Sequence, residues 1–124
     1  MIPKTLELAT QSNMQKRIGC IITDKRGRPI SFGVNKKKTH PLQEHYAKQA
    51  MFPKKLYLHA EIAALVKCRD QGHTIWVGRL LQNGTPALAR PCPICLAAIK
   101  ESGIKVIMYT DNNGNVLALD VNDY

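Results

Sequence analysis

The chain has 124 residues and an ordinary composition, 44% hydrophobic and 22% charged, which excludes a two-domain protein and a wholly disordered chain. No apolar run approaches the roughly 18 to 20 residues of a membrane helix, and the N-terminal residues lack the apolar stretch of a signal peptide. The formal net charge is +9, and residues 1–62 carry 12 Lys and Arg against 4 Asp and Glu, whereas residues 63–124 carry 6 against 5. We therefore expect one cytoplasmic domain over residues 1–124, with a basic half that attracts phosphate groups.

The first half of the chain predicts a short helix followed by a hairpin. Residues 3–14 have the composition of a short helix, and residues 17–24 and 29–35 are apolar, β-rich runs separated by a turn at Gly27. A polar segment with many lysines then runs from residue 36 to residue 55, and its middle could form a short helix. A connection of this length inside a compact domain is more often functional than accidental.

The second half predicts two helices, a strand between them and a final hairpin. The helices are expected over His59–Asp70, stopped by Gly72, and over Cys92–Glu101, ending at Gly103. The strand-like runs are residues 73–84, 104–110 and 115–121. The resulting order, α-β-β-α-β-α-β-β, describes one mixed sheet with helices packed on it, an α/β layered domain.

Two of the four cysteines, Cys92 and Cys95 in "RPCPIC", have C-x-x-C spacing at the start of a predicted helix. The first turn of a helix puts both sulfurs on one side, where the N-terminal partial charge and free backbone N–H groups favour thiolates. Thiolates at this spacing are typical zinc ligands. Without an export signal we expect no disulfides, and we expect Cys20 and Cys68, which lie in apolar patterns, to be core residues.

A zinc site needs a further ligand, and no second C-x-x-C motif exists to complete a four-cysteine structural site. Of the four histidines, His59 is the best placed, because it too starts a predicted helix and an α/β domain can bring two helix N-termini together at one sheet edge. Three protein ligands leave the fourth position to water, as in catalytic zinc sites. Glu61, two residues on, points to a different face of the helix and is predicted to act as general acid and base.

The motifs "LHAEIAAL" and "ARPCPIC", each opening a predicted helix, resemble the H-x-E…P-C-x-x-C signature of the cytidine and deoxycytidylate deaminase superfamily. The resemblance runs along nearly the whole chain and is greatest to the deoxycytidylate-type deaminases of bacteria and their phages, through "KTHPLQ" as well. It implies a three-layer α/β/α sandwich with a five-stranded mixed sheet. It also implies one zinc ion held by His59, Cys92 and Cys95, with proton transfer by Glu61.

The resemblance further implies contacts with the substrate. The backbone N–H of Ala60 would meet the carbonyl of the base, the carbonyl of Arg90 or its neighbour would face the exocyclic amine, and Asn35 would contact the sugar. Lysines bracket the loop before the catalytic helix, where they either bind a nucleotide phosphate or a nucleic-acid backbone or form a solvated rim. These lysines are Lys36, Lys37, Lys38, Lys54 and Lys55.

The expected reaction is zinc-dependent hydrolytic deamination of cytosine to uracil in a free nucleotide or nucleoside, foremost of the deoxycytidylate type. The predicted final hairpin would make the last strand antiparallel, which the resemblance associates with nucleoside deaminases and not with the nucleotide and polynucleotide branches. Two alternatives stay open: a deaminase of single-stranded DNA or RNA, favoured by the basic half, and a non-catalytic zinc-stapled binding module. The resemblance also implies a homo-oligomer, in the host cytoplasm if the chain is phage-encoded, and the lack of a long apolar run predicts no membrane partner.

Overall fold

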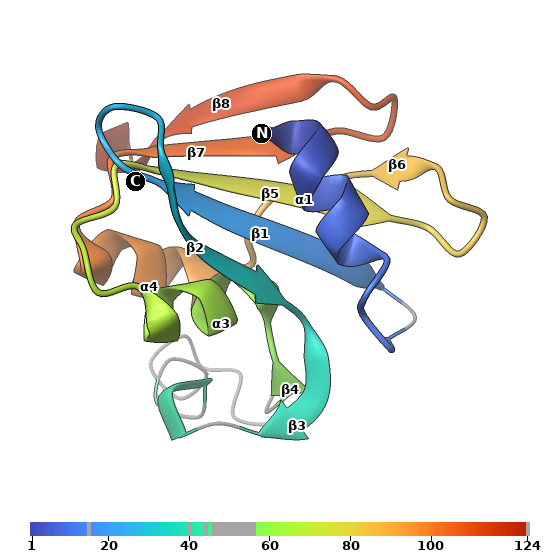
Figure 1. Ribbon diagram of the computed structural model, residues 1–124, viewed down its shortest axis with the longest axis horizontal. Helices are drawn as coiled ribbons and strands as arrows, with labels where there is room; N and C mark the ends of the chain where they lie inside the picture. Colours follow the sequence, from blue (N-terminus) through green and yellow to red (C-terminus); the bar gives the residue numbers. More distant parts are fainter. Residues whose placement is uncertain (15, 40, 44, 46–56, 124) are drawn as a thin grey trace.

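The computed structural model describes residues 1–14, 16–39, 41–43, 45 and 57–123 (Figure 1). Along the chain, the first half contains α1 (Ile2–Ala9), β1 (Arg17–Thr23), β2 (Pro29–Val34), β3 (Lys36–Thr39) and β4 (Tyr57–Leu58). The second half contains α3 (Ala60–Lys67), β5 (Thr74–Leu80), β6 (Pro86–Ala87), α4 (Pro93–Ser102), β7 (Val106–Thr110), β8 (Val116–Asp120) and the 3₁₀ turn η1 (Val121–Asp123). This order confirms the predicted alternation of helices and strands.

The main sheet has the strand order β2-β1-β5-β7-β8, and the two-residue β6 pairs with β5 beside this path. Strands β5 and β7 are parallel, whereas the pairs β1–β2, β1–β5 and β7–β8 are antiparallel (Figure 1). The predicted mixed sheet and both predicted hairpins are therefore confirmed. The short strands β3, β4 and β6 are additions, and β3 pairs with β4 in a separate two-stranded sheet.

Two glycines allow helices to pack closely on opposite faces of the sheet. A Cβ on Gly19 of β1 would lie 2.1 Å from the carbonyl oxygen of Thr5 in α1, and a Cβ on Gly33 of β2 would lie 2.2 Å from that of Ala60 in α3. Gly33 pairs with Cys20, the neighbour of Gly19, and consecutive strand residues face opposite sides. Because α4 shares a buried apolar cluster with α3, both helices cover the same face, and the predicted three-layer α/β/α sandwich is confirmed.

The helices are short, with 8 residues in α1, 8 in α3 and 10 in α4. No helix in the described part of the chain is long and apolar enough to cross a membrane. The prediction for α3 was wrong at its C-terminal end, because the helix stops at Lys67 and Cys68 is already extended at φ −79°, ψ 111°. The helix that the sequence allowed around residues 42–50 lies mostly outside the described residues.

The two cysteines outside the zinc motif differ in burial. Cys20 is fully buried in the main core cluster, between the sheet and α3, as predicted. Cys68 is only half-buried, and its Sγ donates to the carbonyl oxygen of Asp70 at 3.2 Å. Cys68 packs against the main core cluster, so the expectation of a core residue holds in part, but the early end of α3 leaves it in a loop at the rim of that core.

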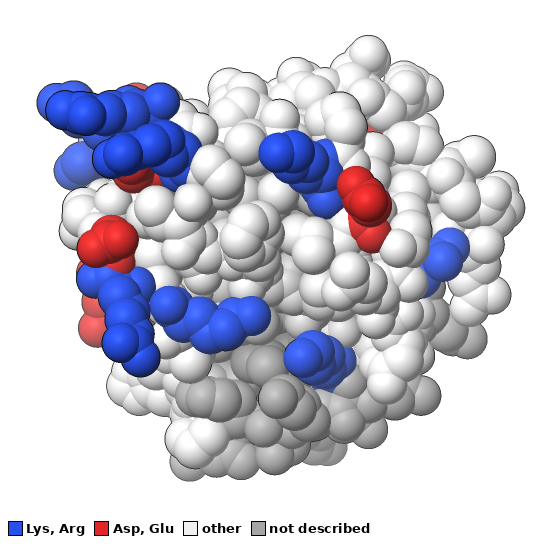
Figure 2. Space-filling view, in the orientation of Figure 1, with Lys and Arg blue, Asp and Glu red and all other residues white. Residues whose placement is uncertain are grey.

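Three of the 12 Lys and Arg of the basic half lie in a turn at one end of the main sheet. Figure 2 shows a group of Lys and Arg side chains at the tip of the β1–β2 hairpin, whose turn carries Lys25, Arg26 and Arg28. At that end Thr23 of β1 pairs with Thr74, the first residue of β5. The basic tip therefore lies at the opposite end of the sheet from the carboxyl end of β5.

Candidate metal centre

Two helices begin at the predicted zinc ligands. His59 is the N-cap of α3 and Cys92 is the N-cap of α4, both with extended backbone, so their side chains stand at the helix entrances. Pro93 in the first turn of α4 has no N–H to leave unsatisfied, and Cys95 follows on the same turn. The predicted meeting of two helix N-termini is therefore confirmed.

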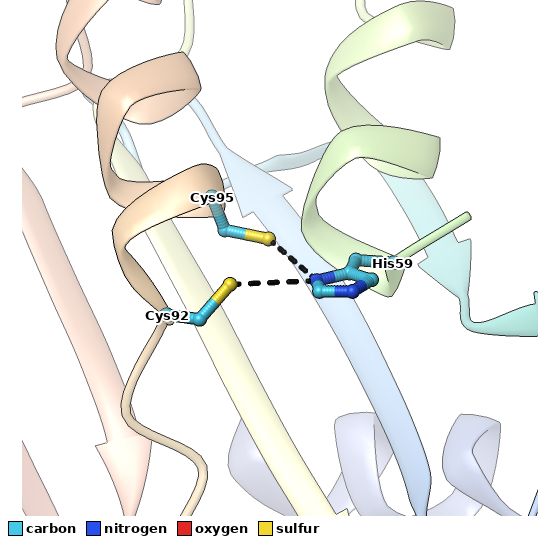
Figure 3. A group of neighbouring side chains, drawn as sticks. All are labelled: His59, Cys92 and Cys95. Carbon is cyan, nitrogen blue, oxygen red and sulfur yellow. Dashed lines mark hydrogen bonds between the residues drawn. The ribbon is translucent and has the colours of Figure 1, made fainter. Parts of the chain in front are cut away.

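The three predicted ligands converge on one point between α3 and α4 (Figure 3). His59 Nδ1 lies 3.2 Å from Sγ of Cys95 and 3.5 Å from Sγ of Cys92, and all three ligand atoms lie within 4.8 Å of one another. In a tetrahedral zinc site with ordinary Zn–N and Zn–S bonds, nitrogen and sulfur lie about 3.6 Å apart. The spacing and the donor types of this group therefore fit a zinc ion.

The two thiols differ in their proton affinity. Hydrogen bonds with Cys95, the larger cause, and with His59 together lower the pKa of Cys92 to about 4, although burial opposes this. Burial and the neighbouring Cys92 raise the pKa of Cys95 well above its ordinary value. One thiolate is therefore already favoured, and a bound cation would displace the proton from the second.

Glu61 lies beside the ligands but is not a member of their group. Its side chain is 4% exposed, and its Oε1 is buried with no hydrogen-bond partner among the described residues. Burial raises the pKa of Glu61, with an opposing effect from His59. A buried carboxyl oxygen without a partner is costly, and such groups cluster at functional sites.

Most of the other predicted site residues are among those that the structure describes. Ala60 is fully buried as the first residue of α3, and Arg90 is exposed just before the zinc motif. Lys36 is exposed on β3, where it pairs in register with Leu58, the residue before His59. Lys37 and Lys38 also lie on β3, and Lys54 and Lys55 lie outside the described residues.

Asn35 is buried directly after β2, at 5% exposure. Its Oδ1 accepts the backbone N–H of Ile18 at 3.0 Å, and its Nδ2 donates to the carbonyl oxygen of Lys16 at 2.5 Å. Its own carbonyl oxygen accepts the hydroxyl of Ser12 at 3.0 Å. Asn35 therefore ties the start of β1 to the end of β2, a structural role that the sequence did not reveal.

The family model for the zinc-binding region of cytidine and deoxycytidylate deaminases matches residues 1–111 of the chain. The chain belongs to the cytidine and deoxycytidylate deaminase family. Membership in this family, together with the cluster of His59, Cys92 and Cys95, identifies the metal as zinc and supports zinc-dependent hydrolytic deamination of cytosine. The predicted family and cofactor are therefore confirmed.

Solved structures of two cytidine deaminases and of RibD share the fold of this family member. The cytidine deaminase of Burkholderia pseudomallei has a TM-score of 0.69 at 16% identity, over 98% of this chain and 91% of that one. The enzyme of Mycobacterium leprae has a TM-score of 0.64 at 14% identity, over 99% of this chain and 92% of that one. RibD of Acinetobacter baumannii has a TM-score of 0.53 at 20% identity, over 89% of this chain but only 26% of its own. No curated protein matches the chain in sequence.

One residue that contacts this deaminase site was missed by sequence reasoning. Gln43 is fully buried, and its Oε1 accepts the backbone N–H of His59 at 3.2 Å. It thereby fixes the start of α3. The side chain of the N-cap residue, His59, faces the metal site and makes no capping hydrogen bond. The sequence does show this glutamine, in "KTHPLQ". It does not show that the side chain accepts a hydrogen bond from a residue 16 positions away.

Proposed function

We propose that the chain is a hydrolase that converts cytosine to uracil in a free nucleotide or nucleoside, with Glu61 as the proton carrier. The observation that carries this proposal is the buried Oε1 of Glu61, which has no partner among the described residues although it lies beside the zinc ligands. A structural zinc site has no need of such a carboxyl group. A catalytic site needs one, because water must lose protons and the leaving amine must gain one.

The reaction adds water at C4 of cytosine, breaks the bond between C4 and the exocyclic nitrogen, and releases ammonia. Zinc held by the three ligands supplies a Lewis acid that lowers the pKa of water toward neutrality. Glu61 takes a proton from the water, gives it to the ring nitrogen N3, and then transfers the second proton to the departing amine. Burial raises the pKa of Glu61, which brings its carboxyl closer to the range in which it can both accept and donate a proton.

Three further residues are proposed to hold the base and the sugar. The backbone N–H of Ala60 is in the first turn of α3, where no intrahelical acceptor exists, so it can bind the carbonyl of the base. The carbonyl of Arg90, directly before the zinc motif, would accept the exocyclic amine. Asn35 already makes one hydrogen bond through each group of its amide, which leaves one lone pair and one N–H for a sugar hydroxyl.

Two observations bear on whether the substrate is a nucleoside or a nucleotide. The antiparallel β7–β8 pair is the arrangement expected of nucleoside deaminases, and solved neighbours named cytidine deaminases share the fold. In the other direction, the strongly basic half favours a substrate that carries phosphate, as in a deoxycytidylate-type enzyme. We retain both as members of one proposed class, the free cytosine nucleosides and nucleotides.

Ammonia release tests the proposed reaction. The zinc-loaded protein is incubated with cytidine, deoxycytidine, CMP, dCMP, their triphosphates and an oligonucleotide that contains cytosine. We expect ammonia from at least one of the free compounds, and none after zinc has been removed by a chelator. Full activity without zinc would contradict the mechanism, and turnover of none of the cytosine compounds would contradict the substrate class.

Deamination of single-stranded DNA or RNA is the second candidate, and it rests on the net charge. The basic tip of the β1–β2 hairpin, however, lies at the opposite end of the sheet from the carboxyl end of β5 (Figure 1). A polynucleotide enzyme should lose affinity steeply as salt rises, by about 10³-fold or more between 50 and 200 mM salt if 6 or more phosphates are bound. A shallow salt dependence for an oligonucleotide, with turnover of a free compound, would exclude this candidate.

A further inference from the structure

Arg79 is the second-last residue of β5 and lies on the face of the sheet that α3 and α4 cover. Val77, two residues earlier, belongs to the core cluster that contains Ala60 and Ala64 of α3. Because side chains of a strand alternate between the two faces, Arg79 leaves the sheet on the same face as Val77. It therefore lies on the same face as the zinc centre.

The guanidinium of Arg79 is only partly satisfied. Nη1 donates a long hydrogen bond of 3.4 Å to the carbonyl oxygen of Leu88. Nε is buried and has no hydrogen-bond partner in the part of the chain that the structure describes. Among the described residues, an ion pair joins Arg28 to Asp24, and none involves Arg79. A buried donor such as this Nε–H is unfavourable until an acceptor reaches it.

Arg79 also lies at the edge of the sheet where a substrate of the zinc centre has to bind. The chain passes from β5 through β6 to α4, so the carboxyl end of β5 and the N-cap of α4, Cys92, share that edge. Leu88, which accepts from Arg79, is four residues before Cys92. On the neighbouring strand, Ile18 pairs with Arg79, and its N–H donates to Asn35. Arg79 therefore lies between Asn35 and the segment that leads to the zinc motif.

We propose that Arg79 binds the phosphate group of the substrate, so that the enzyme acts on a cytosine nucleotide in preference to the nucleoside. This inference rests on the proposed deamination of free cytosine compounds. A guanidinium presents Nε and one terminal nitrogen as a fork whose spacing matches two phosphate oxygens. Because Nη1 faces Leu88, the edge formed by Nε and Nη2 is the one that the phosphate meets.

Arg17 offers a matched control on the opposite face of the sheet. Its Nε is also buried without a partner among the described residues, and its Nη2 donates to the carbonyl oxygen of Leu81 at 2.6 Å. Gly19, two residues further along β1, packs against α1, so Arg17 leaves the sheet on the α1 face. The two arginines share chemistry and burial but differ in access to the zinc centre.

The kinetic test compares dCMP with deoxycytidine in the wild type and in the variants Arg79→Gln, Arg79→Lys and Arg17→Gln. We expect Arg79→Gln to lower kcat/KM for dCMP by about tenfold to a hundredfold, as for loss of a charge-assisted hydrogen bond, and to change the value for deoxycytidine less than about threefold. Arg79→Lys should recover part of the loss, because it restores the charge without the fork. Arg17→Gln should leave the preference for dCMP unchanged.

Binding of the reaction products gives a readout that does not depend on turnover. Calorimetry with dUMP and deoxyuridine should show tighter binding of dUMP to the wild type, and Arg79→Gln should lose that difference. Thermal unfolding of each variant shows whether it is folded, and Arg79→Lys serves in place of Arg79→Gln if the latter is not. If Arg79→Gln, or Arg79→Lys in its place, weakens dUMP and deoxyuridine equally, or if the wild type binds both alike, the assignment to phosphate is overturned.

These outcomes separate the two proposals. A protein that releases no ammonia but binds dUMP through Arg79 contradicts the proposed reaction and supports the phosphate site. A protein that deaminates dCMP and deoxycytidine, and whose Arg79→Gln variant loses both activities in the same proportion, supports the reaction and overturns the phosphate site.

Discussion

His59 and Glu61 stand two residues apart at the start of α3, and each meets a different neighbour. His59 Nδ1 faces the two sulfurs, whereas the Glu61 carboxyl is buried beside them without joining the ligand group. The sequence predicted this division because a helix separates such near neighbours in direction. It did not predict Gln43 or Arg79, because their contacts with residues 59 and 88 depend on how distant segments pack.

Asp24 gives a prediction at the scale of a single residue. Its Oδ1 accepts the backbone N–H groups of Arg26 and Arg28 in the β1–β2 turn, and the bond from Arg28 is the main cause that lowers the pKa of Asp24. A carboxyl with a lowered folded pKa stabilises the fold above its unfolded pKa of about 3.9, and this contribution disappears as pH falls through the folded value. We therefore expect Asp24→Asn to destabilise the protein near neutral pH and to lose this effect in acid.

Urea unfolding of the wild type and Asp24→Asn at several pH values checks this prediction. The difference in the free energy of unfolding should shrink from about pH 5 toward about pH 2. The same substitution at Asp111 serves as the comparison. Asp111 lies in the β7–β8 turn, where its Oδ1 likewise accepts the backbone N–H groups of Asn113 and Asn115. A difference that stays constant over this pH range would show that the ionised carboxyl has no part in the effect.

At the scale of elements, Gly33 controls how closely α3 approaches the sheet. A Cβ at this position would lie 2.2 Å from the carbonyl oxygen of Ala60 and 2.6 Å from the nitrogen of Ala64, so α3 must shift. The helix carries His59 at its entrance. We expect Gly33→Ala to lower both the thermal midpoint and the affinity for zinc, measured by calorimetry or by competition with a chelator.

Gly19→Ala is the control for this change. A Cβ there would lie 2.1 Å from the carbonyl oxygen of Thr5, a clash of the same size but with α1 on the other face. Gly19→Ala should therefore lower the thermal midpoint while the zinc affinity of the folded protein stays near that of the wild type. Equal losses of zinc affinity in both variants would mean that the position of α3 does not set the geometry of the ligands.

The strands and helices that the sequence predicted are those with a strong local pattern. The hairpins β1–β2 and β7–β8 alternate apolar runs with glycine turns, and α4 ends at Gly103, which has a left-handed φ of 85°. The end of α3 was placed too late, because Cys68, Arg69 and Asp70 continue a helical composition while the chain turns away after Lys67. The short strands β3, β4 and β6 were missed, because two to four residues carry no periodicity.

At the scale of the whole molecule, zinc should couple the two helix N-termini and thereby stabilise the fold. Each of α3 and α4 is held to the site by its own N-cap residue, His59 or Cys92. A ligand that binds only the folded state adds about 2.7 kcal/mol of stability when its concentration is a hundred times its Kd. We expect chelation to lower the thermal midpoint and zinc to restore it.

The variant His59→Ala provides the control for chelation. With one of the three ligands removed, its thermal midpoint should respond much less to zinc and to the chelator than that of the wild type. Scanning calorimetry with and without zinc measures both proteins under the same conditions. A wild-type midpoint that does not change with zinc would show that the metal is not bound by the folded protein.

The most direct test of Glu61 as the proton carrier compares wild type and Glu61→Gln, each shown by metal analysis to hold one zinc per chain. The substitution keeps the shape of the side chain but removes its capacity to carry a proton, a function worth about 10² to 10⁴ in rate. Ammonia release from the best free cytosine compound should fall by at least about a hundredfold in Glu61→Gln while zinc stays bound. Ammonia release at the wild-type rate from zinc-loaded Glu61→Gln would contradict the assignment of Glu61 and with it the proposed mechanism.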